Sequence, residues 1–282
     1  MNIKQKVEKS EIKNLQKKIE IFVESSLYKE MKKKEEMKNA FKKQIRRVAE
    51  QHDARRHVFE ELGTVVKFVT KPIYEWDTPA LNEYLSDIGI LPMVVEVDNK
   101  KVKGIDILKA YENEPEYSSF GVSWNKKGKE WNRFSKEDII IPNDQEMEWY
   151  LRRFNHVKKQ EDVLLEQYEA LKEETMQLLK HESEKKLSHE YGSFYLRKKA
   201  TTYDVESLMK DFGIDFFIEY GKINRKKLDD FILDGKLKES DLHPFRKEID
   251  RRVDFIIMDI EKEANALEWF HQKMHIAAQN YR

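Results

Sequence analysis

Two stretches that resemble each other decide the fold: residues 81–90 read LNEYLSDIGI, and residues 205–214 read VESLMKDFGI. Their apolar positions coincide, and each stretch ends with Asp, an apolar residue, Gly and Ile. The spacing of the apolar residues predicts an amphipathic helix in both. Gly89 and Gly213 predict the helix ends, because a helix commonly ends at a left-handed residue, a conformation that glycine adopts without strain.

The neighbouring segments repeat in the same order. A glycine-led strand precedes each helix, and a second strand, a lysine-rich turn and a short helix follow it. These segments are 63–69, 93–97, 100–102 and 105–108 in the first copy, and 192–199, 216–220, 222–224 and 225–232 in the second. The strands are rich in β-branched and aromatic residues, as strands usually are. The shared order predicts an internal duplication of a small β-hairpin-and-helix module.

Three long helices are predicted around these modules, at about 4–60, 144–188 and 244–279. The first has apolar residues alternately three and four apart, the spacing of a coiled-coil seam, at Ile12, Leu15, Ile19 and Phe22. Ser25 and Ser26 are the expected interruption. The third has a stripe at Ile249, Val253, Ile256, Ile260, Leu267 and Met274, with Pro244 suited to its first turn.

The second long helix carries the residues that we expect to drive oligomerisation. Its apolar side chains fall on one a/d register, with Glu161, Thr175 and Glu182 as polar exceptions. The predicted oligomerisation residues are Phe154, Val157, Leu164, Tyr168, Leu171 and Leu178. An isolated amphipathic helix gains little in water, so this stripe must be buried. The sequence leaves open whether it packs within the chain or against a second copy, and we expect a homo-oligomer.

We therefore expect an α+β protein, mostly helical, in which long coiled-coil helices join two related modules. The expected segments are an N-terminal helical arm at 1–60, a first module at 61–142, a long helix at 143–190, a second module at 191–240 and a C-terminal long helix at 241–282. The first module has an additional hairpin, from Tyr117 to Trp131 with a basic tip at 125–130. Ile139 to Ile141 are expected to form one more strand.

The composition limits the class of protein. Charged residues make up 38% of the chain and hydrophobic residues 39%, which suits long exposed helices better than one thick core. The absence of cysteine excludes disulfides and cysteine nucleophiles. No apolar run approaches the roughly 20 residues of a membrane span, and no signal peptide is recognisable. We expect a protein of the cytoplasm with no membrane partner.

Motifs for catalysis are not found. The sequence has no glycine-rich phosphate loop and no G-x-S-x-G elbow. His271, His275 and Glu268 lie one turn apart on a predicted helix, but a surface pair is a better explanation than a metal site. The series Glu96, Asp98 and Lys100 is explained equally well by chance. We expect a protein that is not an enzyme and that has no cofactor and no metal.

Basic residues interleaved with aromatic ones are the better indication of function. The net charge of the chain is zero, but residues 1–60 hold 17 Lys and Arg against 10 Asp and Glu. The predicted nucleic-acid or partner-binding residues are Arg197, Lys199, Lys222, Arg225, Lys226, Arg46, Arg47, Arg55 and Arg56. Strand alternation places Lys198 opposite Arg197 and Lys199. Such side chains can bind phosphate or an acidic protein surface, and the alternative is an ordinary solvated hairpin.

Residues 155–240 resemble the Gam family of Mu-like phages, and residues 40–110 resemble it more weakly. The likeness lies in the glycine-led strand 192–199, the helix and turn 205–214, the pair Phe217-Ile218 and the turn Ile223-Asn224-Arg225. The family binds DNA ends and inhibits host nucleases. The resemblance implies a phage or mobile-element protein that inhibits a host nuclease or antiviral defence complex in the bacterial cytoplasm.

The sequence leaves the mode of inhibition open. The protein binds its host target directly, binds double-stranded DNA, or does both. Zero net charge favours protein binding, since strong non-specific DNA binders are usually basic overall. The alternatives are a DNA-binding accessory protein of recombination or replication, and a structural coiled-coil assembly protein.

Overall fold

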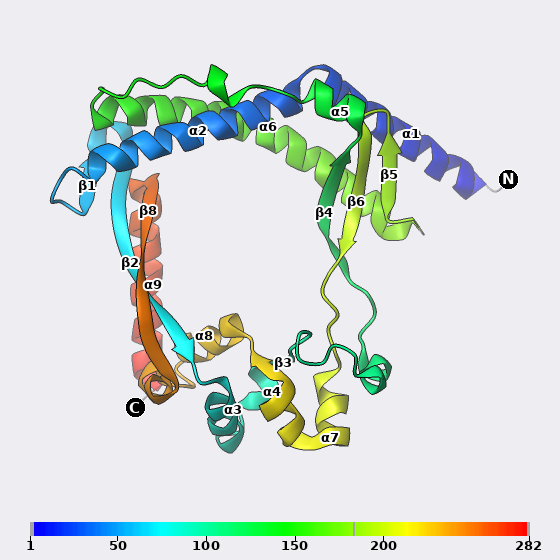
Figure 1. Cartoon of the computed structure of the whole chain (residues 1–282), viewed down its shortest axis with the longest axis vertical. Coiled ribbons are helices and arrows are strands. Elements are labelled where there is room, and N and C mark those ends of the chain that lie inside the picture. Colours follow the sequence, from blue (N-terminus) through cyan, green and yellow to red (C-terminus); the bar gives the residue numbers. More distant parts are fainter. Residues whose placement is uncertain (1–2, 183, 281–282) are drawn as a thin grey trace. The chain divides into compact units, whose positions relative to one another are not determined.

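The computed structural model describes residues 3–182 and 184–280 (Figure 1). The chain is mixed α and β and mostly helical, as predicted, with 58% helix, 22% strand and small antiparallel sheets. It divides into two compact units, each built from two stretches of sequence. Unit 1 comprises residues 1–55 and 116–199, and unit 2 comprises residues 56–115 and 200–282. Segments that are consecutive in sequence therefore do not form separate compact bodies.

Three helices form the frame of unit 1: α1 (Ile3–Glu24), α2 (Leu27–Ala49) and α6 (Met147–His181). The predicted interruption between the first two is confirmed, because Ser26 has a left-handed backbone with φ of 60°. The prediction that the first helix continues to residue 60 is wrong. Helix α2 ends at Ala49, and residues 56–59 form a strand of unit 2 instead.

Helices α2 and α6 pack against each other in opposite directions. Phe41 near the end of α2 lies beside Trp149 near the start of α6, and Tyr28 near the start of α2 lies beside Tyr168, with ring centroids 6.3 and 5.6 Å apart. The polar exceptions in the α6 stripe have partners. Glu161 is almost fully buried and forms an ion pair with Lys38 at 2.5 Å. The Thr175 hydroxyl donates to the Leu171 carbonyl oxygen at 2.7 Å, so neither residue is left buried without a partner.

The sheet of unit 1 has the order β4-β6-β5, with β4 (Tyr117–Trp124), β5 (Lys186–His189) and β6 (Gly192–Lys198) all antiparallel. Strand β6 confirms the predicted glycine-led strand. A Cβ at Gly192 would lie 2.2 Å from the Ser123 carbonyl oxygen, so only glycine fits there. Phe194 and Leu187 of this sheet pack on Leu15, Ile19 and Leu179 of the helices.

The predicted hairpin from Tyr117 to Trp131 is wrong. Strand β4 pairs with β6, and the supposed basic tip is the short helix α5 (Lys126–Trp131). The side chain of Asn125 begins α5 by accepting a hydrogen bond from the Gly128 amide at 2.9 Å. The strand predicted at residues 139–141 does not form either. A short 3-10 helix, η3 (Lys136–Asp138), precedes this segment, and Ile140 is exposed.

A long two-stranded ribbon forms one part of unit 2. Strand β2 (Thr64–Trp76) pairs with β8 (Arg246–Asp259) from Thr64 opposite Asp259 to Trp76 opposite Arg246, and β1 (Arg56–Phe59) extends the sheet on the other side of β2. The long helix predicted at 244–279 is therefore wrong in its first half. Its apolar residues fit a helical stripe, but pairing with β2 makes 246–259 a strand, in which Phe255 packs on Phe68. Pro244 lies in the 3-10 helix η4 (Glu239–Phe245).

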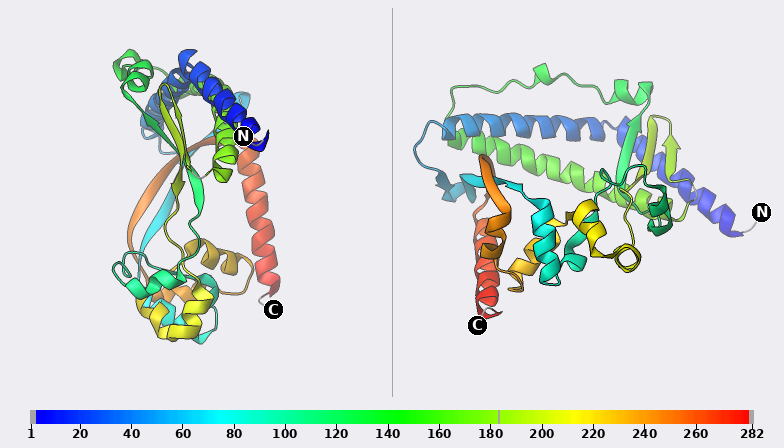
Figure 2. Two further views of the ribbon diagram at one scale, coloured as in Figure 1. Left: turned by 90° about the vertical axis from the view of Figure 1, so that its right-hand side faces the viewer. Right: turned by 60° about the horizontal axis from the view of Figure 1, so that its bottom comes forward.

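Helix α9 (Ile260–Asn280) follows β8 directly, and beyond its start it lies apart from the ribbon in the left-hand view of Figure 2. Glu263 fixes its first turn to the sheet. This carboxylate is 6% exposed and accepts hydrogen bonds from Arg56 at 2.7 Å and Lys67 at 2.6 Å. These contacts lower the pKa of Glu263 to about 2. Beyond this turn α9 is mostly exposed.

The remaining elements of unit 2 pack around one core. They are α3 (Thr78–Asp87), α4 (Leu91–Val94), β3 (Val95–Val97), η2 (Asp106–Tyr111), α7 (Val205–Tyr220), β7 (Gly221–Ile223) and α8 (Arg225–Leu233). The predicted left-handed glycines are confirmed, with φ of 71° at Gly89 and 75° at Gly213. Leu81, Leu208 and Phe217 are fully buried between these elements.

The strand predicted at 93–97 forms from Val95 to Val97, whereas the strand predicted at 216–220 is wrong. Residues 216–220 continue α7 as a helix beyond the kink at Gly213, and Met93 lies in α4. Only β3 and β7, of three residues each, are extended, and they pair with each other in antiparallel register. In this core the aromatic residues of 216–220 fill space as helical side chains, because Phe217 packs inward while Asn82 donates to its carbonyl oxygen at 3.0 Å.

Candidate functional site

The best candidate site is a groove of about 490 Å³ in unit 2, where the ends of four elements meet. Trp76 ends β2, Arg246 begins β8 opposite it, and Arg225 begins α8. The side chain of Asn224 caps α8 by accepting a hydrogen bond from the Lys227 amide at 3.2 Å, which fixes the position of Arg225. Leu228, Ile232 and Leu242 supply an apolar lining. We call this site the Arg225 groove.

Two arginines lie against aromatic rings in the Arg225 groove. The Cζ atom of Arg225 is 3.6 Å from the centre of the Trp76 ring. The Cζ atom of Arg246 is 4.4 Å from the centre of the Tyr74 ring and 5.7 Å from that of Trp76. A guanidinium on an aromatic face has a fixed plane and keeps its N–H groups for a second partner at the edge. The arrangement therefore suits recognition of a planar anion.

The Arg225 guanidinium has fewer hydrogen-bond partners than it has buried N–H groups. Its Nη1 atom is buried and has no hydrogen-bond partner among the described residues. Burial lowers the pKa of the Arg225 guanidinium, Asp229 acts in the opposite direction, and the charge of Arg246 lowers the pKa again. A bound anion would supply the missing charge, because a partly desolvated cation costs free energy until it is paired.

Carboxylates stand beside both arginines. Glu239 forms an ion pair with Arg246 at 2.8 Å and is itself well exposed. The pKa of Asp229 is raised above its ordinary value, because burial raises it and the neighbouring charge of Arg225 offsets this only in part. The groove thus combines two guanidinium groups, two carboxylates and an apolar wall. This set can bind and orient a ligand.

The predicted basic residues of unit 2 lie in different surroundings. Lys222 lines a separate cavity of about 270 Å³ with Lys227, and its Nζ is 3.9 Å from Glu96. Lys226 is exposed on α8. Arg56 is paired with Glu263. Of this set in unit 2, Arg225 is the residue that lines the groove.

The other predicted basic residues belong to unit 1. Arg197 lies over the Tyr195 ring at 5.7 Å, and Lys199 forms an ion pair with Glu116 at 2.9 Å. Arg46 pairs with Glu50 at 2.8 Å, and Arg47 donates to the Gln44 side chain and to the Asn143 carbonyl oxygen. Arg55 is exposed at the end of the first stretch of unit 1. Several of these cations are therefore neutralised by the chain itself.

The predicted oligomerisation residues pack largely inside unit 1. Phe154 and Val157 are buried. Leu164, Tyr168, Leu171 and Leu178 are half-buried, and three of them contact the core that contains Leu15 and Ile19. Burial raises the pKa of Tyr168 far above its ordinary value. Self-association through this stripe stays a prediction.

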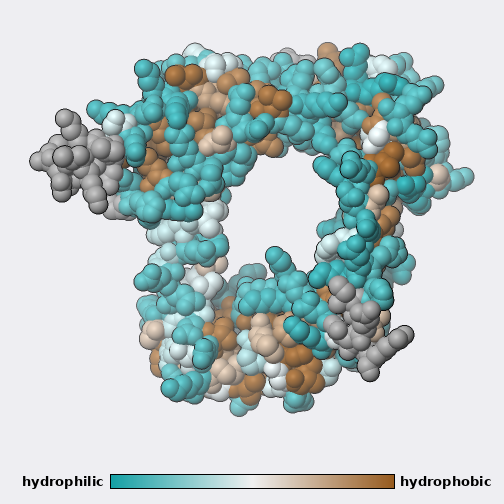
Figure 3. Space-filling model, turned by 180° about the vertical axis from the view of Figure 1, so that it is seen from behind, coloured by the Kyte–Doolittle hydropathy of each residue, from teal (hydrophilic) through white to brown (hydrophobic). Residues whose placement is uncertain are grey.

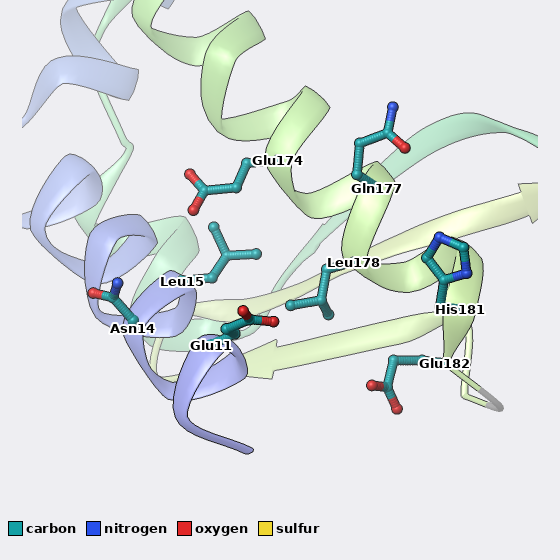
Figure 4. A pocket seen from close by; sticks show the side chains of 8 residues that line it. All are labelled: Glu11, Asn14, Leu15, Glu174, Gln177, Leu178, His181 and Glu182. Atoms are coloured by element: carbon teal, nitrogen blue, oxygen red, sulfur yellow. The ribbon is translucent and has the colours of Figure 1, made fainter. Parts of the chain in front are cut away.

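A second hollow, of about 500 Å³, lies in unit 1 between α1 and the end of α6 (Figure 4). Acidic and amide side chains surround it, among them Glu11, Glu174 and Glu182, and His181 lies at its edge. Glu174 is already paired with Lys18 at 2.7 Å. Within residues 3–182 and 184–280 no group of three His, Asp or Glu side chains is placed to hold a metal ion. We regard this hollow as a solvated helix groove.

Sequence reasoning found Arg225 but missed Trp76, Tyr74 and Arg246. The aromatic pair at 74 and 76 follows a predicted strand and was the available signal. Arg246 was not predicted because residues 244–279 were expected to form one helix, in which Arg246 would not lie opposite Trp76.

Comparisons with protein-family models, with curated proteins and with solved structures find no match for this chain. Among the residues that the structure describes, no helix has the length and apolar character needed to cross a membrane.

Proposed function

We propose that this chain is a non-enzymatic binding protein of a phage or mobile element that inhibits a host nuclease or antiviral defence complex. It acts in the cytoplasm of the bacterial host cell by gripping its target protein, with double-stranded DNA as a further partner. The Arg225 groove carries the proposal, because two guanidinium groups near the Trp76 ring, those of Arg225 and Arg246, line it. The resemblance of residues 155–240 to the Gam-like inhibitors supports the same reading.

Direct protein binding is favoured over general coating of DNA. Each phosphate contact gains free energy by releasing counterions, and this gain is smaller for a cation that already has a carboxylate partner. Arg46, Arg56 and Lys199 have such partners within the chain. In the alternative function, that of a DNA-binding accessory protein, Arg197 would contact phosphate. This residue is exposed on β6 and lies over the Tyr195 ring.

The architecture fits a duplicated, Gam-like ancestor. We propose that 78–97 and 205–223 derive from one module, because each has a helix, a left-handed glycine, a further helical segment and a short strand in the same order. We also propose that α2 and α6 form an antiparallel coiled coil.

Inhibition can be tested directly. The purified chain is added to a bacterial extract that degrades linear duplex DNA, and the rate of degradation is measured. We expect slower degradation with the wild type, and loss of the effect with Arg225→Lys, which keeps the charge but not the stacked plane. Lys226→Ala is the matched control, because Lys226 is exposed on the same helix. Unchanged degradation with the wild type would refute the proposal.

A mobility-shift assay separates the two modes. If inhibition occurs while the chain does not shift duplex DNA at low salt, the target is a protein. A salt-dependent shift that Arg197→Ala weakens supports the alternative function.

We propose self-association as well, with α9 as the surface. Leu267, Phe270 and Met274 are three and four residues apart and are 53%, 49% and 52% exposed. Figure 3 shows brown, hydrophobic areas at several places on a mostly teal, hydrophilic surface. Leu267→Asp should lower the mass measured by sedimentation, whereas Val163→Asp, at an exposed apolar residue of α6, should not. A measured wild-type mass of 34.0 kDa, that of a monomer, at micromolar concentration would count against self-association.

A further inference from the structure

The Arg225 groove has features that decide between kinds of anion. Its cationic centre consists of Arg225 on Trp76 and Arg246 on Tyr74. Asp229 and Glu239 stand at the same groove and carry negative charge close to any ligand that approaches the arginines. Like charges that line one groove repel a negative ligand, and the repulsion grows with the charge of the ligand. A singly charged group is therefore accepted more readily than a phosphate that carries two charges or a DNA strand that carries many.

The walls of the groove add a second requirement. Leu228, Ile232, Leu233 and Leu242 line it, and Leu228 and Leu242 are themselves buried in the core of unit 2. An apolar wall beside a guanidinium favours binding of a ligand in which an apolar group is joined to the charged group. Many ligand sites are built in this way, with a mostly apolar lining and a few placed polar groups. A sugar–phosphate backbone has no such body next to its charge.

The size of the groove sets the scale of the ligand. A volume of about 490 Å³ lies within the range of small-ligand sites and is sufficient for a few amino-acid residues. Arg225 is held at the start of α8 by the Asn224 cap, and Arg246 by its pairing with Trp76. The two guanidinium groups are thus placed before any ligand arrives, which lowers the entropy cost of binding.

We propose that the Arg225 groove binds a carboxylate that stands next to an apolar side chain, presented by a short segment of a partner protein. The source is either the C-terminal carboxylate of a chain that ends in an apolar residue or an Asp or Glu side chain with an apolar neighbour. The inference rests on the proposed function in one respect, that the partner is a protein. The carboxylate chemistry itself can be tested without the partner.

The test uses small probes and the full-length chain. N-acetyl-leucine carries a free carboxylate, N-acetyl-leucinamide is the same body without the charge, and N-acetyl-leucyl-glutamyl amide carries the charge on a side chain. Each probe, inorganic phosphate and a duplex oligonucleotide are titrated while the indole N–H resonance of Trp76 is followed by NMR. Trp76→Phe assigns that resonance among the five tryptophans of the chain.

The expected result is a saturable shift of the Trp76 resonance with N-acetyl-leucine at millimolar concentration or with the glutamyl probe. N-acetyl-leucinamide should give a shift at least tenfold weaker. The stronger of the two carboxylate probes identifies the source. Arg225→Lys should abolish the shift, and Lys226→Ala should leave it unchanged; spectra of both variants report whether the fold is retained.

Two results would overturn the proposal. The first is a response to phosphate or duplex DNA that exceeds the response to both carboxylate probes, which would make the groove a phosphate site. The second is an equal response to N-acetyl-leucine and N-acetyl-leucinamide, which would make it an apolar site without anion recognition. Neither result depends on nuclease inhibition, so failure of this inference is distinguishable from failure of the proposed function.

Discussion

Glu263 is the residue whose replacement should most clearly weaken unit 2 through charge alone. In the variant Glu263→Gln, the amide cannot reproduce the two charge-assisted hydrogen bonds to Arg56 and Lys67. A carboxyl group with its pKa lowered from 4.5 to about 2 contributes at most about 3.5 kcal/mol, at about 1.4 kcal/mol for each tenfold change in proton affinity. The Arg56 side chain is 53% exposed, so solvent screens its half of the interaction. We expect a loss of about 1–2 kcal/mol in the free energy of unfolding.

The pH dependence gives the same interaction a second signature. Because the folded-state pKa of Glu263 lies below its ordinary value, its stabilisation is complete above pH 4.5 and is lost as the pH falls from about 4.5 towards 2. The difference between wild type and Glu263→Gln should therefore be full at pH 7 and should shrink across this range. Urea unfolding followed by tryptophan fluorescence at a series of pH values measures it.

Glu261→Gln is the control, because Glu261 is exposed in the same turn of α9. It should change the free energy of unfolding by only a few tenths of a kcal/mol. The reasoning is refuted if both variants lose equal stability at pH 7, or if the loss caused by Glu263→Gln is undiminished at the lowest pH at which the fold persists.

Three further predictions concern stability. Phe154→Ala should destabilise unit 1 by about 3–5 kcal/mol, measured by urea unfolding, because a buried ring of α6 is replaced by a cavity; an effect below 1 kcal/mol would mean that the ring is not packed. Gly213→Ala should lower the thermal midpoint by a few degrees, since φ of 75° strains any residue with a Cβ although no atom lies within 4 Å of the added carbon. Asn224→Ala should cost about 1 kcal/mol through loss of the helix cap, and Asn224→Asp should restore only part of it, because the new carboxylate lies against Glu96, to which the Asn224 amide donates.

The features that sequence predicted correctly are local ones. The interruption at Ser25 and Ser26 and the left-handed glycines depend on a few neighbouring residues. Arg225 was also found in this way, since basic residues at the start of a short helix are visible in the sequence itself. Such signals persist because capping and backbone conformation are decided within one turn.

The features that sequence missed depend on distant partners. Residues 246–253 have a helical spacing of apolar side chains, yet they form a strand because β2 offers a complementary edge far away in the chain. Residues 216–220 are rich in aromatic and β-branched types, yet they are helical because Phe217 fills the core beside Leu81. The Arg225 groove also depends on distant partners, because Trp76 and Arg246 lie opposite each other only when β2 and β8 pair in the observed register. Tertiary pairing overrides local propensity at each of these places.

The pairing of β2 with β8 also governs how the nascent protein matures. The chain emerges from the ribosome with its N-terminus first. Strand β2 therefore leaves the exit tunnel long before β8, the strand that will pair with its edge, has been translated. During that interval the row of N–H and C=O groups along β2 is an open template for pairing with another chain. Strand β2 contains three residues that disfavour such pairing: Lys67, Lys71 and Pro72. A lysine places a charge at the strand edge, and a proline has no N–H to donate to a second strand. A truncated polypeptide that ends before Arg246 keeps this edge permanently and should accumulate as aggregates.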